Sequence, residues 1–199
     1  MLAPSWSPED ETKPAPMPLR LLQSFVNTWE GDSGVDLLAD AETGPPPWLQ
    51  EAGLLPGSGV DLARVREVRE GIRALLVSNS GESDQEQADA GFLRALADGV
   101  RLQPVVLDDG TVDLRSAGAD DLSSLAAALL LIIRDAQRDG SWARLKACRN
   151  PDCHWAFYDR SHAGRGAWCD MAVCGNRIKN RNLRTRRSTR SGATRDAAS

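Results

Sequence analysis

The spacing of apolar residues along the chain predicts a mainly helical body. Apolar side chains recur at helical spacing between residues 19 and 29, and a Gly-rich stretch at 31–34 ends that segment. A second apolar stripe runs from Leu62 to Leu76 and follows Asp61, an acid suited to capping a helix. Residues 122–136 are the most apolar segment, so we expect them to form the central helix of the core.

Between residues 100 and 114, apolar residues occupy alternate positions instead of recurring at helical spacing. Alternate apolar positions flank the turn at 108–110, a pattern typical of a β-hairpin. A short helix is predicted just before this hairpin, over 88–97. The predicted fold class is therefore α+β, with a mostly helical N-terminal domain that contains one β-hairpin, followed by a small C-terminal module.

Charge divides the chain near residue 140. Residues 1–140 carry a balance of −13, whereas residues 141–199 carry +9. Polyanions are natural partners for such a basic part. We predict four segments: a flexible Pro-rich tail at 1–18, an acidic, mainly helical regulatory domain at 19–140 with its own core, a basic module at 141–190 and a flexible tail at 191–199.

The composition and the motifs indicate which classes of protein are expected and which are not. Hydrophobic residues make up 41% and charged residues 26% of the chain, as in globular proteins. No apolar run reaches the ~18–20 residues that span a bilayer, and no secretory signal is recognisable, so we expect a cytoplasmic protein without a membrane partner. The body has no histidine and no recognisable nucleophile or phosphate-binding motif, so we do not expect an enzyme.

All four cysteines lie in the basic module, in two C-x4-C pairs separated by fifteen residues. They are Cys148, Cys153, Cys169 and Cys174. Two thiolate pairs suit tetrahedral Zn²⁺, which contributes roughly 10–16 kcal/mol to small modules that lack a large core. Four cysteines would complete the coordination shell, so the predicted zinc is structural. The alternatives are four buried free thiols or disulfides.

Histidines and aromatic residues crowd the same module. His154 follows a predicted ligand and is either a competing ligand or, as we favour, a residue beside the site. The aromatic residues Trp155, Phe157, Tyr158 and Trp168 form either a stacking platform for bases or a hydrophobic mini-core around the metal. We favour the mini-core for at least three of them.

The segment after Cys174 is basic on nearly every face. No Pro or Gly interrupts residues 176–187, so a helix is predicted there. Guanidinium groups and amides at these positions suit phosphates and base edges better than a protein core. The candidate nucleic-acid-binding residues are Asn176, Arg177, Lys179, Asn180, Arg181, Arg184, Arg186 and Arg187.

The cysteine module closely resembles the CGNR zinc finger. The resemblance rests on FYDRS at 157–161, WCDMAVCGNR at 168–177 and the two cysteine pairs. The body resembles, more loosely, the stress-induced transcription regulator domain that usually accompanies this finger, through FVNTW at 25–29 and VREVREGIRALL at 65–76. The resemblance implies a bacterial protein that binds DNA through its finger.

These observations predict a DNA-binding transcription regulator whose acidic domain senses or recruits an effector. A small-molecule pocket is predicted at Asn27, Trp29 and Trp48, with core and capping roles as the alternative for these three. A homodimer would supply the two contacts that specific DNA sites usually need. The alternative functions are an RNA-binding or protein-interaction module, and a redox sensor in which oxidation of the cysteines releases zinc.

Overall fold

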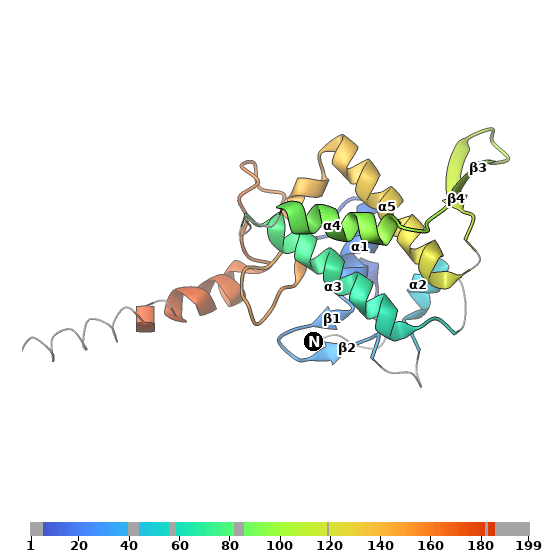
Figure 1. Ribbon diagram of the computed structural model, residues 1–199. Helices are drawn as coiled ribbons and strands as arrows, with labels where there is room; N and C mark the ends of the chain where they lie inside the picture. The colour runs from blue at the N-terminus through green and yellow to red at the C-terminus, as the bar shows by residue number, and fades with distance from the viewer. Residues whose placement is uncertain are drawn as a thin grey trace, which may run out of the picture.

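The computed structural model describes residues 6–39, 44–55, 59–81, 86–118, 120–181 and 183–185. Its helices are α1 (Leu19–Val26), α2 (Pro47–Glu51), α3 (Leu62–Ser78), α4 (Glu86–Ala97) and α5 (Asp121–Asp139), with short turns η1 (Pro8–Asp10), η2 (Trp142–Arg144) and η3 (Met171–Gly175). The strands of the described residues form three antiparallel pairs: β1 (Trp29–Glu30) with β2 (Val35–Asp36), β3 (Leu102–Val106) with β4 (Val112–Ser116), and β5 (Leu145–Ala147) with β6 (Ala156–Tyr158). In Figure 1 the β3–β4 hairpin projects from one end of the body and the red C-terminal helical residues leave from the other.

The main helices form where the apolar stripes predicted them. Asp61 caps α3, because its side chain accepts hydrogen bonds from two backbone N–H groups of the first turn. Asp120 caps α5 by accepting a hydrogen bond from Ser123 N, and Gly140 ends that helix in the left-handed conformation that glycine tolerates. The α+β class and the hairpin are confirmed. No helix in the described part of the chain is long and apolar enough to cross a membrane.

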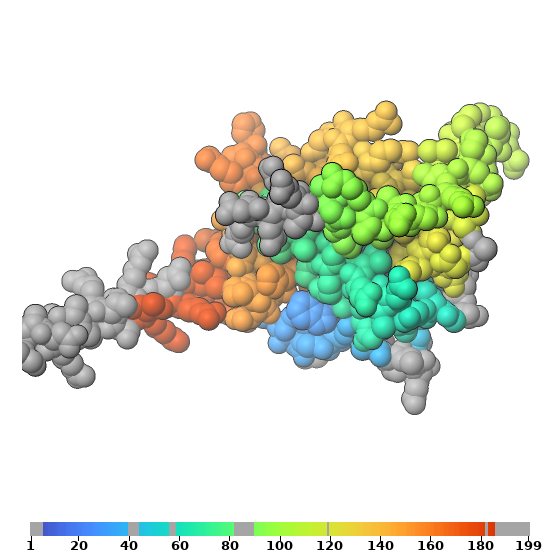
Figure 2. Space-filling model, viewed as in Figure 1, coloured from blue at the N-terminus to red at the C-terminus, as the bar shows by residue number. Residues whose placement is uncertain are grey.

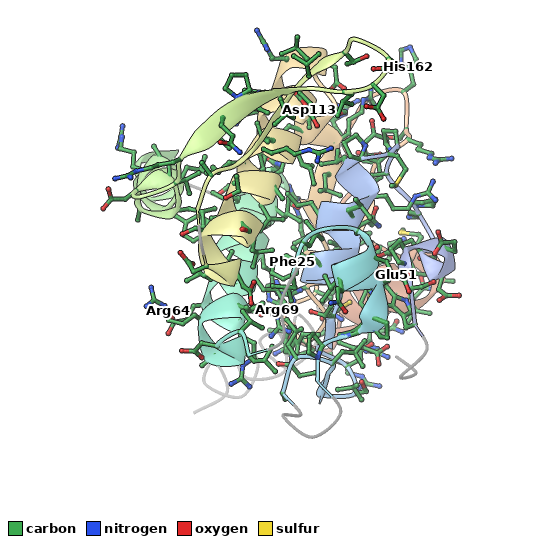
Figure 3. The ribbon with its side chains drawn as sticks, turned by 90° about the vertical axis from the view of Figure 1, so that its right-hand side faces the viewer. Phe25, Glu51, Arg64, Arg69, Asp113 and His162 are labelled. Carbon is green, nitrogen blue, oxygen red and sulfur yellow. The ribbon has the colours of Figure 1, made fainter. Side chains whose placement is uncertain are left out.

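The main hydrophobic core lies among α1, α3 and α5 and continues into the cysteine-bearing segment. Phe25, central in Figure 3, is fully buried, and so are Leu145 of β5 and Ala156 of β6 in the same core. Hydrogen bonds join the two parts as well, since Ser80 Oγ after α3 donates to Ala147 O at 2.7 Å. The core of residues 19–140 therefore does not end near residue 140 but is shared with β5 and β6.

The flexible tail predicted for residues 1–18 is wrong for residues 6–18. Trp6 is only 8% exposed and packs edge-on against Trp48 and Trp155, with ring centroids 6.1 and 5.9 Å away. Prolines exclude a periodic apolar pattern, but they do not prevent an extended segment from packing on the body. Residues 1–5 and the tail predicted at 191–199 lie outside the described residues.

A buried carboxylate ties this N-terminal segment to α1 and β6. Glu11 accepts hydrogen bonds from Gln23 Nε2, Ser24 Oγ and Asn27 Nδ2, each at 3.0 Å. Burial raises the pKa of Glu11 to about 7, because loss of hydration penalises the charged form more than these donors stabilise it. Asn27 also bonds both backbone polar groups of Ala156, accepting at 2.7 Å and donating at 2.9 Å. The N-terminal segment, the body and the C-terminal module thus meet at one polar cluster.

Candidate metal centre and basic surface

The four cysteine sulfurs converge on one point. All four Sγ atoms lie within 4.8 Å of one another. The separations Cys153–Cys169 and Cys169–Cys174 are both 3.7 Å. A tetrahedral ion with Zn–S bonds of about 2.3 Å has S–S edges of about 3.8 Å. The cysteines form no disulfide, so the donor set and spacing fit one Zn²⁺.

Two backbone turns hold the sulfurs in place. The first pair flanks the turn between β5 and β6, where Cys153 N donates to Asn150 O at 2.9 Å and Cys148 N donates to Trp155 O at 3.0 Å. In the second pair, Cys169 precedes η3 and Cys174 lies within it; η3 is a single π-helical turn that begins after Asp170. The Asp170 side chain accepts from Val173 N at 2.8 Å and so caps that turn.

The electrostatics of the cluster favour a bound dication. The hydrogen bonds among the sulfurs lower the pKa of the Cys148 thiol and raise the pKa of the Cys153 and Cys169 thiols, because crowded sulfurs cannot all carry negative charge without a cation. Asn150 is completely buried, and its Nδ2 donates to Cys174 Sγ at 3.7 Å. Such donors orient a thiolate ligand and offset part of its charge. Four sulfurs would complete the coordination shell and leave no position for a substrate. Zinc bound here would therefore be structural and would stabilise the fold of the module.

The residues around the cluster form a small second core. Phe157 is buried with the cysteines, and Trp155 and Trp168 pack against the same cluster. Tyr158 instead packs against the main core. Three of the four aromatic residues thus belong to the predicted mini-core. His154 lies outside the four-cysteine cluster, and its buried Nδ1 has no hydrogen-bond partner.

The basic surface begins directly after the last cysteine. Residues 176–181 and 183–185 are helical, and in Figure 2 they extend from the orange module at the edge of the body. A cleft of about 400 Å³ lies between this helix and the ligand turn, where Arg177, Arg181 and Arg184 line it together with Asn150 and Asn180. Three of the candidate nucleic-acid-binding arginines are therefore brought together on one cleft.

Two of these arginines are paired with acids. Arg177 Nη1 contacts Asp32 Oδ1 at 2.7 Å, which raises the pKa of the guanidinium, and both side chains stay substantially exposed. Arg181 Nη1 lies 3.7 Å from Asp152 Oδ2. Arg184 has no acidic partner among the described residues. The module's charge is thus partly neutralised by the body and by its own ligand turn.

The other candidates on this segment have different surroundings. Lys179 and Asn180 are exposed. The Asn176 side chain donates to Ala172 O at 3.0 Å, which is a role inside the helix start rather than toward a ligand. Arg186 and Arg187 lie outside the described residues.

The turn between β1 and β2 touches the metal-binding turn. A Cβ atom on Gly31 would lie 2.7 Å from Asp152 O and 2.8 Å from Cys153 O, so only glycine fits without a backbone shift. The next residue, Asp32, reaches Arg177 from the same turn. Sequence reasoning missed Asp32, because nothing local distinguishes it from other surface acids.

Comparison with protein families agrees with this geometry. A family model described as "ABATE: Putative stress-induced transcription regulator" matches residues 19–138, which is more than half of the chain. The chain belongs to this family. A second family model, the CGNR zinc finger, matches residues 144–187 and includes the four cysteines and the cleft arginines. No individual curated protein matches the chain.

The three residues predicted to line an effector pocket in this ABATE-family chain have packing and hydrogen-bonding partners in the structure. Asn27 is fully buried and bonded to Glu11 and Ala156. Trp29 lies under the Arg73 guanidinium, 4.7 Å from the ring centroid, and Trp48 packs on Trp6. Neither the cleft described above nor the cavity described below is lined by these three residues. They serve packing and hydrogen bonding, which was the alternative reading.

Proposed function

We propose that the chain is a bacterial, cytoplasmic regulator that binds DNA through the cleft beside its zinc centre. The observation that carries this proposal is the convergence of Arg177, Arg181 and Arg184 on a cleft whose far wall is the metal-binding turn. Zinc would fix that wall, and the helix would present guanidinium groups to successive phosphates. Arginine forks suit phosphate oxygens, and such contacts give affinity without sequence preference.

The acidic body supplies the sensing part of the proposal. A cavity of about 280 Å³ lies among α3, α4 and α5, with an apolar floor that includes Val68, Phe92 and Leu122 and charged residues Arg64 and Glu67 at its edge. A small amphipathic effector would fit this cavity better than it would fit the site predicted from the sequence. The body would also repel DNA through its net charge.

Duplex DNA binding should weaken steeply with salt. If five phosphates are contacted, log K should fall with log salt at a slope of about −4.5, or ~0.9 per phosphate. Arg184→Ala should weaken binding to all duplex sequences alike and flatten the slope by about 0.9, since it removes one cation from the cleft. Fluorescence anisotropy of a labelled duplex, titrated with the zinc-loaded full chain at several salt concentrations, measures both quantities.

The matched control is Arg94→Ala, which removes the same side chain from an exposed position on α4. This control should leave affinity and slope unchanged. Tighter binding to a structured RNA than to duplex DNA would favour the RNA-binding alternative. If neither nucleic acid binds at low salt, where the attraction is strongest, the proposal fails and a protein-interaction role replaces it.

Asp32 should compete with phosphate for Arg177. Asp32→Asn removes the carboxylate that contacts the guanidinium, so we expect duplex affinity to rise about two- to fivefold, the range for an exposed ion pair. Asp98→Asn serves as control, because it removes the same charge from an exposed position after α4. An equal gain in both variants would mean that only net charge matters. Weaker binding of Asp32→Asn would mean that Asp32 orients Arg177 for its target.

A further inference from the structure

The cavity among α3, α4 and α5 has a wall that depends on a glycine. α3 and α4 lie side by side and run in opposite directions (Figure 1), and the Phe92 ring of α4 packs on α3 at Gly71. A Cβ atom at position 71 would collide with the edge of this ring. The ring can therefore approach α3 so closely only because residue 71 has no side chain. This packing holds Phe92 in place as one wall of the cavity of about 280 Å³.

Apolar side chains line this cavity and are only partly covered by the protein. Phe92, Leu96 and Leu122 pack against the main core but stay half-buried, and all three line the cavity. Apolar surface that remains open to water favours an apolar group that covers it. The volume lies just below the ~300–1,000 Å³ of sites for drug-sized ligands. The cavity therefore suits a ligand that is smaller than a drug and has one apolar body.

Charged groups of both signs surround the same cavity. Arg64 and Glu67 lie about one turn apart on α3, Asp98 directly follows α4, and all three are exposed residues of the cavity lining. Because α3 and α4 are antiparallel, the residues that precede Gly71 on α3 lie toward the end of α4. Within the described part of the chain, none of these three side chains forms an ion pair. A ligand with one positive and one negative group would find a partner for each of them here.

We propose that this cavity binds an apolar α-amino acid, an inference that rests on the proposed sensing function and names the class of its effector. The ammonium group would lie between Glu67 and Asp98, and the carboxylate would pair with Arg64. The side chain would cover Phe92 and Leu122. A simple amine would leave Arg64 unpaired beside its cation, and a simple carboxylic acid would add a third negative charge beside the two acids. The zwitterion pairs both kinds of charge at once.

Isothermal titration calorimetry of the zinc-loaded full chain, without nucleic acid, tests the ligand class. L-Leucine and L-phenylalanine are the probes, and at least one should bind with a dissociation constant of ~0.01–1 mM, as suits a small ligand whose head group stays hydrated. The tighter probe is then compared with its decarboxylated amine (3-methylbutylamine or 2-phenylethylamine) and its deaminated acid (4-methylpentanoate or 3-phenylpropionate). Each analogue should bind at least ~3-fold more weakly, because each loses one exposed ion pair.

Two tryptophan substitutions test the location of the site. Ala95 and Ala97 are both exposed residues of α4, but of these two only Ala95 lines the cavity. Ala95→Trp should occupy part of the cavity and weaken binding of the amino acid at least ~10-fold, because it displaces the apolar body of the ligand. Ala97→Trp adds the same side chain outside the lining and should leave the affinity unchanged. Thermal unfolding followed by circular dichroism checks that both variants fold.

Two charge variants test the recognition of the head group. Arg64→Gln should weaken binding of the amino acid at least ~3-fold without weakening the amine, because the amine has no carboxylate to lose. Glu67→Gln should weaken the amino acid and the amine alike. Arg138→Gln is the control, since it removes a cation from an exposed position on α5 outside the cavity lining. This control should change neither affinity.

Three results would overturn the proposal: neither amino acid binds at concentrations up to ~10 mM, the amine binds as tightly as the amino acid, or Ala95→Trp binds as tightly as the wild-type chain. The titrations contain no nucleic acid, so their outcome is separate from duplex binding. A chain that binds an amino acid but no duplex would refute the proposed DNA-binding function and keep this ligand. A chain that binds duplex DNA but no amino acid would refute only the ligand.

Discussion

Replacing any one of the four cysteines with serine is expected to reduce bound zinc from one ion per chain to nearly none and to unfold the C-terminal module. The mini-core around the cluster consists of Phe157 and a few half-buried residues, which is too little apolar surface to fold alone. Structural zinc supplies roughly 10–16 kcal/mol in such modules, most of which is lost with one thiolate. Elemental analysis of protein purified under reducing conditions measures the metal, and near-UV circular dichroism reports the packing of Trp155 and Trp168.

The control for this experiment is His154→Asn. His154 follows a ligand but lies outside the cluster, and its positive φ of 50° is one that asparagine tolerates. This variant should keep one zinc per chain. A Cys169→Ser variant that retains full zinc, or a wild-type chain with much less than one zinc, would contradict the four-cysteine site.

Truncation after Gly140 is expected to abolish cooperative folding of the remaining fragment. The cut removes the buried core residues Leu145 and Ala156, and it takes away the bonds of Asn27 to Ala156 and of Ser80 to Ala147. A buried leucine contributes about 2–5 kcal/mol, and each orphaned buried polar group costs about 1–3 kcal/mol. Because whole domains are stable by only about 5–15 kcal/mol, the sum approaches the entire stability. Thermal unfolding followed by circular dichroism checks this.

A chain truncated after residue 185 is the matched control, because it keeps every described residue. It should unfold at nearly the same temperature as the full chain. If the fragment 1–140 instead unfolds cooperatively near that temperature, the acidic body folds by itself, as its sequence alone suggested, and the shared core contributes little.

The sequence predicted the elements whose signals are local. The stripe from Leu62 to Leu76 and its cap Asp61 lie within a few turns of one helix, so period and capping chemistry indicate α3 directly. The same holds for α5 and for the β3–β4 hairpin. The cysteine pairs were equally readable, because metal-ligand spacing is a local pattern that restricts the chemistry.

Contacts between distant parts of the chain could not be predicted in this way. Glu11 and Asn27 are unremarkable in sequence, yet they join the N-terminal segment to β6. Asp32 contacts Arg177 across 145 positions. Neither pairing produces a repeating pattern in the sequence. Reasoning from charge separated the chain into an acidic body and a basic module, whereas the packing joins them.

The position of Trp6 between Trp48 and Trp155 has a consequence for synthesis of the chain. Trp6 is synthesised well before Trp155, so the segment that carries it leaves the ribosome before this neighbour exists. Until the C-terminal module is made, the core of the nascent body stays incomplete, and Glu11 and its amide partners stay hydrated. Completion of the fold then depends on when the cysteine turns emerge and acquire their ion. A shortage of zinc in the cell would therefore destabilise the whole chain rather than the module alone. The incompletely folded chain would be open to proteases from α1 onward.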